Sequence, residues 1–121
     1  MPTLTESRHA GGFLVWEASR DYCREVVTLD AGDLEAGTVL GRITIGGNYV
    51  AYNPAASDGS QTAAAVLWDN ADASAGDVAA VAVVRGPAIV NRHDLVFAGT
   101  LSEPEITAAH VALATAGIIT R

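Results

Sequence analysis

The residues able to do covalent chemistry are few in this sequence and lie far apart along the chain. Cys23 is the only cysteine, and the available bases are His9, His93 and His110. Nucleophilic catalysis needs the thiol and a base within hydrogen-bond reach of each other. Nothing local brings Cys23 and His93 together, and a lone cysteine in a strand is more often a small buried apolar residue. This pattern favours a structural role over catalysis.

Acidic residues are the other chemically active group. Asp30, Asp33 and Glu35 lie close enough in sequence to suggest a calcium loop. They lack the ligand spacing and the terminal bidentate glutamate of such a loop. Gly46-Gly47 falls between two predicted strands rather than before a helix, so it does not predict a phosphate-binding loop. We therefore expect no bound metal and no cofactor.

The charge of the chain argues against several classes of partner. Fourteen acidic residues against seven basic ones give a net charge of −7, and every basic residue is arginine. Binding to a nucleic acid depends on clustered Lys and Arg that release counterions, and these arginines are scattered. No apolar run approaches the roughly 18 residues of a membrane span, and no secretory signal pattern begins the chain. We expect a soluble protein made in the cytoplasm, without a nucleic-acid or membrane partner.

The elements that must position these residues are mostly strands, and a stretch from Leu34 to Asp69 shows them best. Thr38–Ile45 is rich in β-branched residues, and Gly46-Gly47 can form a tight hairpin turn into Asn48–Tyr52. Turn-forming residues at 53–60 predict a loop, and residues 63–68 then predict an apolar strand. This stretch is scaffold and contains no catalytic pattern.

Apolar runs elsewhere predict more strands. Alanine and valine on both faces of Val78–Arg85 indicate burial on both sides, and Gly86-Pro87 marks a bend or a sheet edge. Trp16 is interpreted as a core aromatic, with a side chain that binds a partner as the alternative. The remaining predicted strands are Phe13–Trp16, Tyr22–Leu29, Ala88–Val90 and Ile118–Thr120.

One helix is predicted near the C-terminus. Ser102 followed by Glu105 forms a capping-box pattern, and Pro104 is tolerated in a first turn. Gly117 is placed to end the helix. The apolar stripe of this helix comprises Ile106, Ala109, His110, Leu113 and Gly117.

The first 12 residues differ from the rest. Pro2, several polar residues and a terminal Gly11-Gly12, without an apolar period, predict a flexible extended arm. Leu4, between Thr3 and Thr5, is a candidate anchor; the alternative is a frayed terminus without a role. Residues 13–121 are then one mostly β domain, a small antiparallel β-barrel or β-clip-like fold with one short C-terminal helix.

The central stretch also carries a resemblance to a known family. The run GTVLGRI at 37–43, then YNPAASDGSQTAAAVL at 52–67, resembles the phage lambda-type head decoration proteins, and the likeness continues through 80–88 and 95–117. The resemblance implies a homotrimer on three-fold positions of the expanded head, outside the capsid, with the major capsid protein as partner. It further implies that the arm contacts the shell and that the head is reinforced against genome packing pressure. The capsid-binding candidates are Thr3, Leu4, Thr5 and Arg8.

Two other functions stay open at this point. One is another virion β module, such as a tail or fibre-tip component. The other is a small trimeric β-clip nucleotide hydrolase, for which Asp58-Gly59-Ser60 is the nearest approach to a catalytic turn. A plain loop is the simpler interpretation of those residues.

Overall fold

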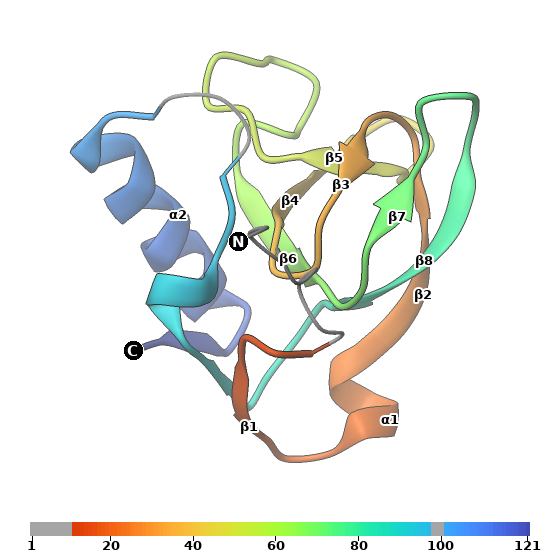
Figure 1. Cartoon of the computed structure of the whole chain (residues 1–121). Helices are drawn as coiled ribbons and strands as arrows, with labels where there is room; N and C mark the ends of the chain where they lie inside the picture. The colour runs from red at the N-terminus through yellow and green to blue at the C-terminus, as the bar shows by residue number, and fades with distance from the viewer. Residues whose placement is uncertain (1–10, 98–100) are drawn as a thin grey trace, which may run out of the picture.

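The computed structural model describes residues 11–97 and 101–121, and a closed five-stranded barrel is its largest element (Figure 1). Neighbouring strands are antiparallel except β2 and β5, which meet in parallel through the single pair Leu29 and Tyr49. This confirms the predicted mostly β class and the small antiparallel barrel. In order around the barrel, the strands are β2 (Arg24–Leu29), β5 (Tyr49–Ala51), β4 (Val39–Arg42), β6 (Ala63–Leu67) and β8 (Val78–Val83).

Small side chains let this barrel close. Its interior is filled by a few leucines set among alanines, including Leu29, Leu40, Ala65 and Ala82. Gly41 is required at one point, since a Cβ there would lie 2.5 Å from the Cα of Ser60. The loop at 53–60 can therefore fold closely over β4.

A second layer packs on one side of the barrel. A three-stranded sheet and the helix α2 (Glu103–Thr115) share with the barrel a core that includes Val39, Val66, Leu113 and Ile118. Figure 1 shows α2, in blue, on the side of the barrel where β6 lies. The sheet strands, in spatial order, are β1 (Leu14–Glu17), β9 (Ala88–Val90) and β10 (Ile118–Thr120).

The helix begins and ends where the sequence indicates. The Glu105 carboxylate accepts hydrogen bonds from the Ser102 backbone N–H and hydroxyl, both at 2.9 Å, and these bonds lower the pKa of Glu105. The Tyr52 hydroxyl donates to the Glu105 carbonyl oxygen at 3.1 Å, which links the helix to the loop after β5. Gly117, with φ of +88°, follows the helix and leads into β10.

Short elements complete the described chain. Asp33 lies opposite Asp72 in the two-stranded sheet. The elements are one helical turn α1 (Arg20–Cys23), the 3₁₀ turn η1 (Arg92–Asp94) and the pair β3 (Asp33–Leu34) and β7 (Ala71–Asp72).

Several sequence predictions differ from the structure. The strand predicted from Tyr22 begins at Arg24, because residues 20–23 form α1 first. Trp16 is not a core residue: it is 51% exposed, since a bulge in β1 leaves it and the preceding residue on the outside. Burial on both faces of β8 is wrong at Ala79, which is exposed on the outer barrel wall.

The central hairpin is wider than a two-residue turn. Its strands end at Arg42 and resume at Tyr49, and the Gly47 N–H bonds to the Ile43 carbonyl oxygen. The bend at Gly86-Pro87 is confirmed, because β8 and β9 on its two sides belong to different sheets.

Candidate functional site

The predicted capsid-binding residues lie outside the part of the chain that the structure describes. The first residue that it does describe is Gly11, near the end of the predicted arm, and we call this position the root of the predicted arm. The Gly11 N–H donates to the Trp68 carbonyl oxygen at 2.8 Å, so Gly11 is held at a fixed point beside the end of β6. All four candidates, Thr3, Leu4, Thr5 and Arg8, fall among residues 1–10, which the structure does not describe.

Only glycine fits at this root. Gly11 has φ of +66°, and a Cβ added to it would lie 2.2 Å from the Cη2 atom of Trp68. Its backbone therefore rests directly against the indole ring. The placement of the arm boundary at residue 12 stays a prediction.

The Trp68 ring is contacted on further sides by a side chain of β2 and by one from the turn just before β1. The Arg24 guanidinium lies over the indole, 3.4 Å from the ring centroid, a cation–π arrangement. Phe13 meets the ring edge-on, with centroids 5.9 Å apart. We call the set of Gly11, Phe13, Glu17, Arg24 and Trp68 the arm-root clamp.

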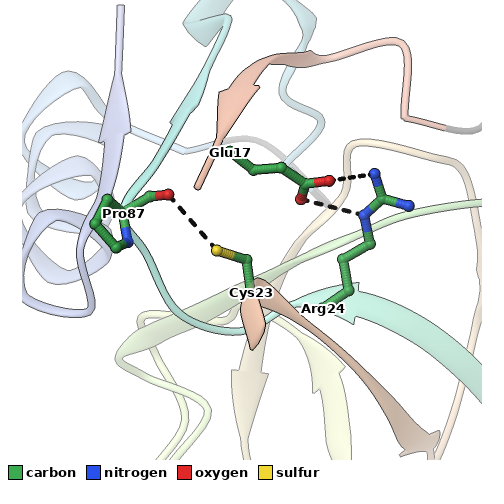
Figure 2. A network of polar contacts seen from close by, with 4 residues as sticks. All are labelled: Glu17, Cys23, Arg24 and Pro87. Carbon is green, nitrogen blue, oxygen red and sulfur yellow. Dashed lines mark hydrogen bonds and ion pairs between the residues drawn. The ribbon is translucent and has the colours of Figure 1, made fainter. Parts of the chain in front are cut away.

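An ion pair fixes the arginine of the clamp. Figure 2 shows both carboxylate oxygens of Glu17 facing the guanidinium of Arg24, with Nε donating to Oε2 at 3.2 Å and Nη2 to Oε1. The two side chains are only 19% and 11% exposed. A two-point contact of this kind neutralises the charge of the guanidinium and also fixes the orientation of its plane. The clamp therefore joins β1, β2 and β6 at the root of the arm.

Cys23 lies next to this ion pair and has a packing role. Its side chain is fully buried, and Sγ donates to the Pro87 carbonyl oxygen at 3.5 Å (Figure 2). His93 is exposed on η1, so the structure does not assemble the pair considered from the sequence. Burial of Cys23 is as predicted, although the residue belongs to α1 and not to a strand.

His110 packs as part of the helix stripe. Its ring meets Phe97 edge-on at a centroid distance of 6.2 Å. Burial, and then the nearby charge of Arg92, lower the pKa of His110. The imidazole is therefore held in its neutral form against apolar neighbours.

Asp58-Gly59-Ser60 is a structural turn, as its simpler interpretation predicts. Asp58 Oδ1 accepts from the Ser60 N–H at 3.0 Å and from the Ser60 hydroxyl at 2.6 Å. These bonds lower the pKa of Asp58. A carboxylate engaged in this way closes the loop and is not placed to act as a general base.

The acidic residues considered for calcium separate in the fold. Asp33 lies on β3, while Asp30, after β2, shares a hydrogen bond with Asp77 that raises the pKa of Asp77. Across residues 11–97 and 101–121, no group of three or more His, Cys, Asp or Glu residues is arranged to hold a metal ion. Within those same ranges, no helix is long and apolar enough to cross a membrane.

The arm-root clamp is the feature that sequence reasoning missed. Gly11-Gly12 was identified as the end of an arm, and this glycine pair was the available signal. The contact of Arg24 with Trp68 joins residues 44 positions apart and leaves no pattern in the sequence.

Comparison with known proteins identifies the family. Residues 3–118 match the family model described as bacteriophage lambda head decoration protein D. A search of curated proteins returns no match. The matched region includes almost the whole chain, from the arm through the barrel to the start of β10. The chain therefore belongs to the phage lambda head decoration protein D family, whose members are structural proteins of the capsid surface and not enzymes.

Proposed function

We propose that this protein binds the outside of the expanded phage head as a homotrimer at three-fold positions and reinforces the shell against the pressure of the packed genome. The observation that carries the proposal is the family match over residues 3–118. The partner is the major capsid protein. The acidic surface, at −7 per chain, is consistent with an exterior position away from the genome.

Reinforcement of this kind needs no chemistry. A protein that binds the assembled shell and not its separated subunits stabilises the shell by mass action. At a free concentration 100 times the Kd, each site contributes about 2.7 kcal/mol against disassembly. Many such sites on one head add up to a large resistance.

The arm is the proposed contact with the shell. Thr3, Leu4, Thr5 and Arg8 would contact the capsid, with the arm backbone pairing with an exposed strand edge of the shell. The anchored root supports this role. Because Gly11 is bonded to Trp68, an arm segment starts from a fixed position, which limits the conformations it must lose on docking.

Co-sedimentation with expanded, undecorated heads of the phage tests the function. We expect saturable binding with a stoichiometry in multiples of three, and heads that withstand higher temperature once decorated. Absence of binding would overturn the proposal, and saturation by isolated monomers or by dimers at two-fold positions would overturn its trimeric part.

Deletion of residues 1–10 tests the arm while leaving Gly11 in place. We expect an unchanged melting transition, because ordering a free segment costs roughly 1–2 kcal/mol per residue and this one has little apolar surface to offset that cost. Head binding should be lost or greatly weakened. Leu4→Asp should weaken binding more than Ser7→Asp, which adds the same charge without removing the anchor. Full binding by the truncated chain would place the contact on the barrel.

A further inference from the structure

A polar hollow of about 460 Å³ lies on the barrel wall between β2 and the β4–β5 hairpin. Its lining includes two of the seven arginines of the chain, Arg42 and Arg85, together with Glu25, Thr28 and Tyr49. Two cations at one hollow are notable in a chain with twice as many acidic as basic residues. The hollow is separate from the arm-root clamp, with which it shares no residue.

The two arginines differ in their contacts. Arg85 is fully engaged: Nη2 lies 2.6 Å from Glu25 Oε2, Nη1 donates to the Tyr22 carbonyl oxygen, and the guanidinium stands 5.2 Å from the Tyr22 ring centroid. Among the residues that the structure describes, none forms a hydrogen bond or ion pair with the Arg42 side chain. The hollow therefore presents one uncompensated positive charge.

The hairpin turn places that charge. Gly47 has φ of +76°, and a Cβ added there would lie 3.0 Å from Nη2 of Arg42 and 3.4 Å from its Nε. The guanidinium thus lies against the bare backbone of the turn. Gly46, with φ of +90°, has nothing within 4 Å of an added Cβ, so the close approach is specific to Gly47.

Exposed apolar side chains flank the hollow. Ile45, at the tip of the hairpin, is 89% exposed, and Val26 on β2 is 68% exposed. An arginine beside exposed apolar groups has the composition of an interface centre, where arginine and large apolar residues are enriched. We call Val26, Arg42, Ile45 and the hollow the Arg42 surface.

We propose that the Arg42 surface is a contact between copies of this chain, in which the Arg42 guanidinium binds a carboxylate of a second copy. This inference rests on the proposed trimer. Charge complementarity points to a second copy, because each copy is at −7 and supplies an excess of carboxylates. A guanidinium can bind a carboxylate through two parallel hydrogen bonds. Such a contact offsets the repulsion among acidic copies and fixes their relative orientation.

Sedimentation velocity over a wide concentration range tests the proposal. Arg42→Glu should weaken self-association about tenfold or more, since it places two like charges in contact. Arg20→Glu is the matched control: it makes the same charge change at an exposed residue of α1 and should leave self-association unchanged. Added salt screens both the Arg42 contact and the repulsion among copies at −7, so it should favour association of Arg42→Gln more than that of the wild type.

A glycine pair gives an independent test. Gly46→Ala and Gly47→Ala impose comparable backbone strain, because both positions have positive φ, but only a Cβ at residue 47 crowds the Arg42 guanidinium. We expect Gly47→Ala to weaken self-association more than Gly46→Ala. Equal effects of the two would contradict the placement of Arg42 by the turn.

Two results would overturn the proposal. One is a wild-type chain that neither self-associates at any concentration nor binds heads in groups of three. The other is an Arg42→Glu variant that self-associates normally, whether or not it loses head binding; lost head binding alone would assign the surface to the capsid. Failure of the proposed function gives a different result, because the wild-type protein would then not sediment with heads.

Discussion

Two arginines of this barrel, Arg24 in the arm-root clamp and Arg42 in the Arg42 surface, have opposite environments. Arg24 is stacked on Trp68 and paired with Glu17, and its side chain is mostly buried. Arg42 is exposed and forms no ion pair with the described residues. The first cation stabilises the fold, because its partners belong to the same chain. The second contributes nothing comparable to the monomer, so its placement is better explained by an external partner.

Trp68→Ala should break the clamp with the largest effect. Because Trp68 is only partly buried, we expect a loss near the low end of the range for large core side chains, about 3 kcal/mol of the free energy of unfolding. The variant also removes the ring under Arg24 and beside Phe13, so each loses its aromatic contact, although Arg24 keeps its ion pair with Glu17. Chemical denaturation measures the loss.

Trp16→Ala is the control for that experiment. Trp16 is half exposed on β1, and its removal should cost well under half of the Trp68 value. Equal losses at the two tryptophans would show that the clamp adds nothing beyond the size of the side chain.

Arg24→Gln should cost less, about 1–3 kcal/mol, because the cation–π contact and a partly buried ion pair are lost while much of the packing remains. Glu17→Gln should have a similar effect, since it leaves the Arg24 charge without its carboxylate. The double variant should lose less than the sum of the two single losses, as expected for residues in direct contact. If the losses of unfolding free energy were strictly additive in the double-mutant cycle, the two residues would not be coupled.

The strands and the helix that carry these regions were predictable, because their sequence patterns involve residues close together in the chain. Apolar runs predicted the barrel strands, and Ser102 with Glu105 predicted the start of α2. Gly86-Pro87 predicted the break between two sheets. Each depends on residues adjacent or a few positions apart, where backbone propensity and capping decide the structure.

The arm-root clamp depends on a contact between distant residues, and the Arg42 surface depends on the exact width of a turn, so neither was predictable. The sequence places Arg24 only within the predicted strand Tyr22–Leu29, yet it is the residue that covers Trp68. Trp16 was expected in the core and Arg42 was one of several scattered arginines; a bulge in β1 and the wide hairpin turn decide their environments. Backbone geometry of this kind leaves little trace in composition or periodicity.

Arg42→Gln tests whether Arg42 contributes to the stability of the monomer. Because Arg42 has no internal polar partner among the described residues, the free energy of unfolding of the monomer should change by less than about 0.5 kcal/mol. Denaturation at a concentration low enough to keep the chain monomeric measures it beside Arg24→Gln. A loss as large as that of Arg24→Gln would mean that Arg42 stabilises the fold, and the contrast between the two arginines would fail.

The smallest expected effect belongs to an acidic pair beside the Arg42 surface. Asp30 and Asp77 flank the paired residues Leu29 and Val78, and the Asp30 N–H bonds to the carbonyl oxygen of Tyr49, which lines the hollow. A hydrogen bond to Asp30, and then repulsion from its charge, raise the pKa of Asp77. A raised pKa in the folded state means that ionisation of Asp77 opposes folding above that pKa, and that protonation relieves the penalty as the pH falls through it.

Asp77→Asn removes the repulsion while keeping a side chain that can donate to Asp30. We expect a small rise in the melting temperature at pH 7, which shrinks as the pH is lowered through the raised pKa of Asp77, because the wild type then acquires the proton itself. Asp21→Asn, at an exposed residue of α1, controls for the change in net charge. A lower melting temperature for Asp77→Asn at pH 7 would mean that the carboxylate of Asp77 stabilises the fold. Charged groups at this end of the barrel would then stabilise the monomer, as they do in the arm-root clamp.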